Sequence, residues 1–208
     1  MEQAADLAGL AFILNVVLSR GGRIAAAFAG AWREAHARGV HYALAHTRVP
    51  AVRSAITVTS NGGYPLDQNL YQAVKGMTAA EATTLPGGRI IMAAGCADGL
   101  GGEGFARLLT EMEEPAAFCA RAAAIPADET PPDLWEAQIL ARVLSRCRVT
   151  LVTEQTFGGI GLPPGLDLSP SLAPAVTRAL AEAGPEAKVT VIPDGVGVIP
   201  VTEEHLRS

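Results

Sequence analysis

The sequence predicts a three-layer α/β domain with a mostly parallel sheet, preceded by a β-hairpin and a short helix that belong to an inter-domain region. Two observations support this prediction. From residue 54 onward, short apolar runs alternate with helical patterns, which is typical of parallel strands joined by crossover helices. The apolar runs also lack strict polar alternation, as expected of strands that are covered on both faces.

We therefore expect four strands and four helices in residues 54–208, the α/β domain. The expected strands are 55–59, 89–94, 148–153 and 188–193, and the expected helices are 67–82, 103–124, 132–146 and 171–184. A loop rich in glycine or proline follows each expected strand. In a parallel sheet these loops meet at one edge, where backbone amides and helix amino ends can bind an anion.

Residues 1–53 are expected to form a hairpin, a helix and a connector at the edge of an amino-terminal domain. The apolar runs within 12–30 flank a glycine turn and predict the hairpin. A short helix is expected over 31–39, stopped by glycine, and a polar connector with histidines over 40–53, around Pro50. This part is too small for a core of its own, so we expect it to pack on another surface.

The composition excludes several classes of protein. Hydrophobic residues make up 49% and charged residues 18% of the 208, which argues against disorder, and a net charge of −5 argues against nucleic acids and anionic membranes as partners. The apolar stretch Ala11 to Leu18 is too short to cross a bilayer. The three cysteines are far apart, which favours reduced thiols in the cytoplasm. The four histidines show no metal-ligand spacing.

Two motifs point to chemistries that the surrounding sequence does not support well. Gly99 to Gly104 matches GxGxxG between an expected strand and helix, but no acid follows about twenty residues on, as a dinucleotide site requires. Cys96 stands at an expected strand end, near Asp98, where a cysteine can be a nucleophile if its pKa is lowered. A thiol-dependent enzyme therefore stays an alternative, which rapid alkylation of Cys96 would favour.

The segment 60–75 carries the strongest functional signal. A glycine turn follows the first expected strand, and Asp67 is expected to cap the helix after it. That helix carries Tyr71, Gln72 and Lys75 at spacings that place their side chains on one surface. The arrangement is typical of ligand sites at the carboxyl edge of a sheet.

Lys75 is unusual within this chain. Of the 16 basic residues only Lys75 and Lys188 are lysines, and a lysine differs from arginine in its compact, titratable ammonium. Lys75 is the one beside a glycine turn and other polar groups. Trp135, near the start of a later expected helix, is interpreted from the residues alone as a core or interface side chain.

The string SNGGYPLDQNLYQAVKGM at residues 60–77 resembles the carboxyl-terminal domain of the nickel-dependent lactate racemase family. Further matches run in family order: FILNVVL at 12–18, GGRII at 87–91, CADG at 96–99 and DLWEAQ at 133–138. The resemblance implies a 2-hydroxy acid racemase or epimerase that shuttles a hydride through a nickel-pincer nucleotide. It also implies a catalytic role for Lys75 and Gln72, and substrate contacts for Tyr71, Gln72, Lys75 and Trp135.

The sequence also departs from the family. The lysine that carries the cofactor, the histidine that binds nickel and the catalytic histidine pair have no counterpart here. We therefore expect no cofactor-binding or metal-binding residue in this chain, and expect the chain alone neither to bind the nucleotide nor to racemise lactate. The expected partners are a small 2-hydroxy acid and the missing amino-terminal domain, or a polypeptide that carries it. The alternative is a stand-alone α/β module that binds a small anionic ligand or a partner protein.

Overall fold

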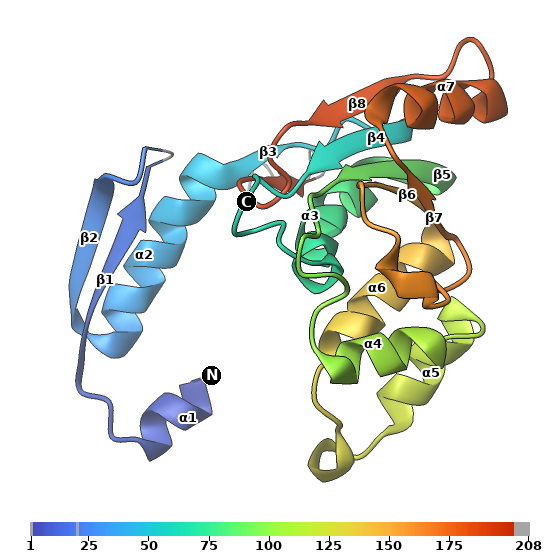
Figure 1. The fold of residues 1–208 in the computed structure, drawn as a ribbon. Helices are drawn as coiled ribbons and strands as arrows, with labels where there is room; N and C mark the ends of the chain where they lie inside the picture. The colour runs from blue at the N-terminus through green and yellow to red at the C-terminus, as the bar shows by residue number, and fades with distance from the viewer. Residues whose placement is uncertain (1, 20, 202–208) are drawn as a thin grey trace. The chain divides into compact units, whose positions relative to one another are not determined.

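A computed structural model describes residues 2–19 and 21–201 and shows two compact units, with the division along the chain between Arg48 and Val49 (Figure 1). The three-layer α/β fold with a mostly parallel sheet is confirmed in the second unit, and the hairpin and helix are confirmed in the first. The domain boundary that the sequence places after residue 53 stays a prediction.

The first unit is a hairpin covered by a helix. Its elements are α1 (Glu2–Leu7), β1 (Phe12–Leu18), β2 (Ile24–Ala31) and α2 (Trp32–Thr47). The strands pair antiparallel from Phe12 opposite Ala31 to Leu18 opposite Ile24, and α2 packs against both. Arg33 of α2 forms ion pairs with Glu2 and Asp6 of α1 at 2.8 and 2.5 Å.

The helix α2 is longer than the sequence predicts. It continues through Gly39 to Thr47, so the first residues of the expected connector over 40–53 are helical. Gly39 lies inside α2, next to the Phe28 ring of β2, and does not end the helix, because a glycine lowers helix propensity without removing a backbone hydrogen bond. The chain becomes extended at Arg48, shortly before Pro50, as expected ahead of a proline.

The second unit contains a five-stranded parallel sheet in the order β7-β6-β5-β4-β8, and a separate pairing of β3 with β9. The strands are β3 (Arg48–Pro50), β4 (Ser54–Ser60), β5 (Thr84–Ala93), β6 (Arg148–Val152), β7 (Leu166–Ser169), β8 (Val189–Ile192) and β9 (Ile199–Val201). The four expected strands are confirmed. The sequence misses β7, because this short strand lies at the end of a segment rich in glycine and proline, and it misses the β3–β9 pair.

The helices of the second unit are α3 (Leu70–Thr83), α4 (Glu103–Thr110), α5 (Pro115–Ala124), α6 (Leu134–Arg146) and α7 (Leu172–Ala183), with short 3₁₀ turns at Ala127–Glu129 and Phe157–Gly159. The single helix expected over 103–124 is wrong, because α4 and α5 are separate. Pro115 lacks the N–H that a helix interior needs and begins α5 instead. The Glu114 carboxylate caps α5 by accepting from the amides of Ala116 and Ala117.

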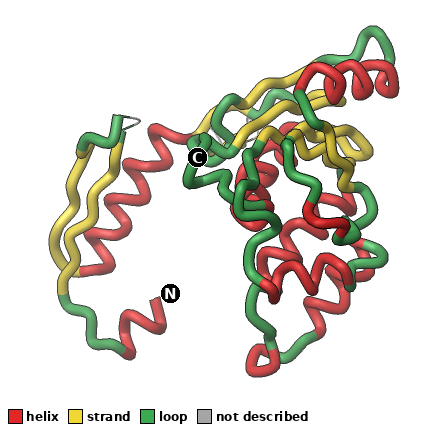
Figure 2. The backbone as a smooth tube through the Cα atoms, in the orientation of Figure 1, coloured by secondary structure: helices red, strands yellow, loops and turns green. Residues whose placement is uncertain are grey.

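Helices cover both faces of the sheet (Figure 2). α3 and α6 pack on one face and α7 on the other. The sheet therefore separates two hydrophobic cores. Of two neighbouring residues of β5, Ile90 belongs to the core beneath α3 and α6, and Ile91 belongs to the core beneath α7. Burial on both faces explains why the strands lack polar alternation.

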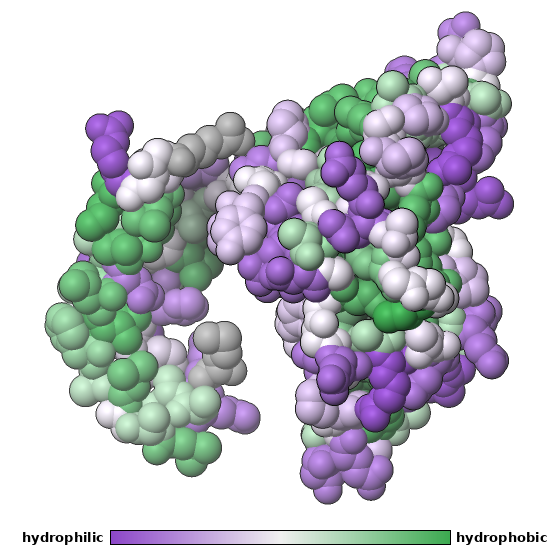
Figure 3. Space-filling model, in the orientation of Figure 1, coloured by the Kyte–Doolittle hydropathy of each residue, from purple (hydrophilic) through white to green (hydrophobic). Residues whose placement is uncertain are grey.

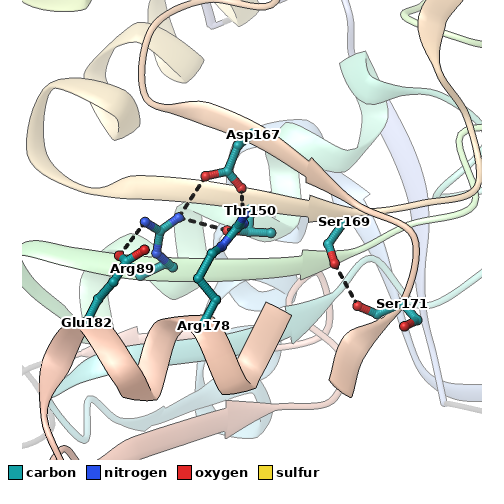
Figure 4. A network of polar contacts seen from close by, with 7 residues as sticks. All are labelled: Arg89, Thr150, Asp167, Ser169, Ser171, Arg178 and Glu182. Carbon is teal, nitrogen blue, oxygen red and sulfur yellow. Dashed lines mark hydrogen bonds and ion pairs between the residues drawn. The ribbon is translucent and has the colours of Figure 1, made fainter. Parts of the chain in front are cut away.

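A charged network joins α7 to the sheet (Figure 4). The Arg89 side chain, 7% exposed, donates to Asp167 of β7 at 2.9 Å, to Glu182 of α7 at 2.6 Å and to Thr150 of β6 at 2.9 Å. Arg178 of α7 donates to the other oxygen of Asp167 at 2.5 Å. Because Arg89 links two strands and a helix, it stabilises the packing of α7.

We expect Arg89→Ala to lower the free energy of unfolding by about 2 kcal/mol, because the buried part of the side chain is lost, Glu182 loses its ion pair and Asp167 keeps only the one with Arg178. Urea unfolding measures the change. The matched control is Arg107→Ala, since Arg107 of α4 is exposed and pairs with exposed Glu111, just after α4, at 3.6 Å, and it should cost less than about 0.5 kcal/mol. Equal losses in the two variants would contradict this account of the network.

Candidate active-site face

The amino end of α3 is held by two side chains in the loop before it. Asn69, and not Asp67 as expected, caps the helix by accepting from the Gln72 amide at 2.9 Å. The Asp67 carboxylate instead accepts from the Gly95 amide at 2.9 Å, in the loop after β5. The two loops that follow β4 and β5 are therefore tied together at the carboxyl edge of the sheet.

Asn61 fixes the next part of α3. It is 1% exposed, and its side-chain amide donates to the Gln72 carbonyl at 3.0 Å and accepts from the Gly76 amide at 2.9 Å. It also donates to the Leu66 carbonyl. Asn61 is not among the predicted site residues, although an asparagine directly after a strand often bonds nearby backbone groups. Its bonds hold the helical turn that carries Gln72 and Lys75.

Four predicted site residues form one continuous surface, here named the α3–α6 face: Tyr71, Gln72 and Lys75 of α3 and Trp135 of α6. The Lys75 Nζ donates to Gln72 Oε1 at 2.6 Å and lies 5.8 Å from the centre of the Tyr71 ring. The Trp135 ring meets the Tyr71 ring edge-on, with 5.9 Å between centroids. The structure thus brings these four side chains together, from segments far apart in the sequence.

The aromatic part of the α3–α6 face is firmly supported but open to solvent. Phe105 of α4 packs edge-on against Tyr71 at 5.3 Å, while Trp135 remains 51% exposed. Burial, reinforced by the charges of Glu136 and Asp133, raises the pKa of Tyr71, so its hydroxyl keeps its proton at neutral pH. A large exposed indole beside a cation is typical of a surface that contacts a ligand or partner.

A carboxyl group that the sequence analysis did not single out lies beneath this face. Glu136 is 0% exposed, and burial raises its pKa to about 7, a rise that the nearby Lys75 ammonium partly opposes. A helical wheel of α6 would have indicated it, because Glu136 shares a helix face with the buried residues Ala137, Leu140 and Leu144.

Known proteins are similar to this chain in sequence and in fold. A family model for the lactate racemase C-terminal domain matches residues 49–200. The chain belongs to the lactate racemase family. It is 47% identical over 199 residues to a lactate racemase of Lactiplantibacillus plantarum and 46% identical over 203 residues to one of Thermoanaerobacterium thermosaccharolyticum.

A solved structure agrees with this assignment. The lactate racemase apoprotein from Thermoanaerobacterium thermosaccharolyticum superimposes with a TM-score of 0.91 at 45% identity and covers 96% of this chain. The chain spans about half the length of these relatives, 47% of each curated sequence and 48% of the solved structure. The matched part therefore corresponds to the family's C-terminal domain with a segment before it.

Other candidate chemistries fit this family member poorly. Cys96 is fully buried, and burial together with the charge of Asp67 raises the pKa of its thiol to about 12, so it is not a thiolate nucleophile at neutral pH. The GxGxxG match opens α4, but an oxygen of Asp133 would lie 3.4 Å from a Cβ on Gly102. A carboxylate of the chain at this helix start disfavours a nucleotide phosphate there.

The residues of this lactate racemase family member that could hold a metal are dispersed. Across residues 2–19 and 21–201, no three His, Cys, Asp or Glu side chains are grouped so as to bind a metal ion. His36, His41 and His46 all lie on α2, and His205 falls outside the described residues.

No helix in the described part of the chain is long and apolar enough to cross a membrane.

Proposed function

We propose that this chain supplies the half of a 2-hydroxy acid racemase or epimerase that closes over the substrate. An upstream domain, or a polypeptide that carries it, would supply the cofactor and the acid and base. The observation that carries the proposal is the α3–α6 face, where an ordered ammonium, a side-chain amide and two aromatic rings adjoin. Lactate is the first substrate to test, because the similar proteins are named lactate racemases.

The polar part of the face suits a 2-hydroxy carboxylate. Lys75 is exposed and cationic, and its ammonium can bind a carboxylate while it keeps its bond to Gln72. The amide of Gln72 offers both a donor and an acceptor, so it can orient the carboxylate or the 2-hydroxyl group. In this proposal Lys75 binds the substrate and Gln72 sets its orientation.

The aromatic part of the face would exclude water. Tyr71 and Trp135 form an apolar wall next to the ammonium, and closure of such a wall on a bound substrate strengthens the ion pair by lowering the local dielectric. Removal of water also protects a reaction in which water competes with the hydride acceptor.

Hydride shuttling and the nickel-pincer nucleotide belong, in this proposal, to the assembled enzyme. The described residues offer no set of side chains that would hold nickel, so this chain is assigned only binding, orientation and exclusion of water. We expect the chain alone to be inactive.

Its free cysteines, Cys96, Cys119 and Cys147, suit a reducing compartment, and we place the protein in the cytoplasm.

The first unit offers a surface for the rest of the enzyme. Side chains that alternate along β1, together with one from β2, form an exposed apolar face: Phe12, Leu14, Val16, Leu18 and Ile24. Figure 3 shows apolar residues gathered over this hairpin. An exposed apolar sheet face of this kind is typical of an interface, which supports packing against further polypeptide.

A chimera tests the proposal. The carboxyl-terminal half of the Lactiplantibacillus plantarum lactate racemase would be replaced by this chain, and racemisation of L-lactate measured in the nickel-loaded protein. We expect activity in the chimera, and neither activity nor stoichiometric nickel in this chain alone. A folded, nickel-loaded chimera without activity, or an active isolated chain, would contradict the proposal. Tight binding of carboxylates by the chain with an inactive chimera would favour a stand-alone binding module.

A further inference from the structure

The packing of α6 does not explain why residue 136, a buried position, is a glutamate. Both of its oxygens lack a hydrogen-bond partner, and they are the only buried side-chain polar atoms in this state within residues 2–19 and 21–201. A buried polar group without a partner costs folding free energy, and one that persists calls for a functional reason. Glutamine or methionine could fill the same volume, so packing alone does not demand an acid.

Glu136 lies directly behind the α3–α6 face. It follows Trp135 in the first turn of α6, and α6 packs against α3, which carries Tyr71 and Lys75. Its charge acts on the Tyr71 hydroxyl, and the Lys75 ammonium acts on Glu136 in turn. A carboxylate at this depth is therefore placed to attract the same ammonium that a substrate carboxylate would bind from the solvent side.

The other charged groups near α6 are exposed, already paired or held against a neighbouring loop. Glu103 and Arg107 of α4 and Arg121 of α5 are exposed, Asp133 lies against Gly102 and Gly104, and Glu81 of α3 pairs with Arg142 and Arg146 further along α6. The strands β5 and β6 face α6 with apolar residues such as Met92 and Leu151. Lys75 is thus the charge that dominates the surroundings of Glu136.

We propose that Glu136 is a positioning residue that controls how strongly Lys75 binds the substrate carboxylate. In its ionised form it attracts the ammonium of Lys75 and repels the incoming carboxylate, and in its neutral form it does neither. This inference rests on the proposed function, because it deepens the role of the α3–α6 face. Glu136 itself does not touch the substrate.

The consequence is that substrate binding takes up a proton near neutral pH. Because burial raises the pKa of Glu136 to about 7, both of its forms are populated in this range. A 2-hydroxy carboxylate stays ionised throughout, so its charge favours the neutral form of Glu136. Affinity should therefore be highest below pH 7 and fall as the pH rises through that value.

The test is the affinity of the 208-residue chain for L-lactate, measured by NMR titration at about pH 6 and about pH 8.5. We expect the dissociation constant of the wild type to rise about fivefold between them, while Glu136→Gln keeps the low-pH affinity at both. Lys75→Ala should bind no lactate at either pH. A pH-independent wild type, or an unchanged pH dependence in Glu136→Gln, would overturn the inference.

A second measurement on the wild type needs no variant to fold and separates the two proposals. The Lys75 Cε chemical shift of the wild type should show a step near pH 7 without lactate, because ionisation of Glu136 changes the field at the ammonium. If the step occurs but lactate binds at neither pH, the coupling stands and the proposed function fails. If lactate binds through Lys75 without a step, the proposed function stands and the inference is wrong.

Discussion

In the chimeric racemase, Lys75→Ala is expected to lower kcat/KM for lactate by about 100-fold or more, the cost of removing a charge-assisted contact to a carboxylate in a closed site. Lys75 is exposed, and its ammonium contacts Gln72 and the Tyr71 ring at the surface, so the free energy of unfolding should hardly change. Lys75→Arg should lose about tenfold, because a planar guanidinium keeps the charge but not the compact geometry.

The matched control is Lys188→Ala, which removes the chain's other lysine. Lys188 is exposed and lies before β8, at the amino end of that strand, whereas the α3–α6 face follows the carboxyl end of β4. Its removal should leave kcat/KM within about twofold of the unmodified chimera, since a distant exposed charge is screened by salt. Similar losses in the two variants would show that net charge, and not the position of Lys75, matters.

Asn61→Ala is expected to lower the free energy of unfolding by about 3 kcal/mol, because it leaves buried backbone groups without partners. The lost bonds are those to the Gln72 carbonyl, the Gly76 amide and the Leu66 carbonyl. The same change should raise KM in the chimera, since α3 would no longer be held at the turn that carries Gln72 and Lys75.

Denaturant unfolding and amide hydrogen exchange would measure this effect, with faster exchange expected at Gly76. Asn69→Ala provides a graded comparison, because it removes a single cap bond to the Gln72 amide and should cost about 1 kcal/mol. If Asn61→Ala is no more destabilising than Asn69→Ala, the buried amide does not hold α3 as described.

The parts of the fold that the sequence predicts well are those with strong local signals. Apolar runs identified β4, β5, β6 and β8, and spacings of three and four placed Tyr71, Gln72 and Lys75 on one helix surface. Only the family resemblance predicts Trp135 as a site residue, because a tryptophan near a helix start is more often part of a core.

The features that the sequence did not predict depend on contacts between distant segments. Gly39 is predicted to end a helix, but a glycine only lowers helix propensity, and packing of α2 on the hairpin carries the helix through it. The roles of Asn61 and Asp67 depend on which backbone groups the fold brings to them. Pro115 is a local signal for a helix start that the single helix predicted over 103–124 does not take into account, and β7 is too short to stand out from its glycine-rich surroundings.

The bond from Lys75 to Gln72 has a consequence for the entropy of binding. A free lysine side chain samples many rotamers, and fixing it on a ligand costs about 1 kcal/mol. Here the ammonium is already held by Gln72 at 2.6 Å on a rigid helix, so most of that ordering occurs when the protein folds. A small acid makes few contacts of its own, so its binding would benefit from a site that loses little further side-chain entropy.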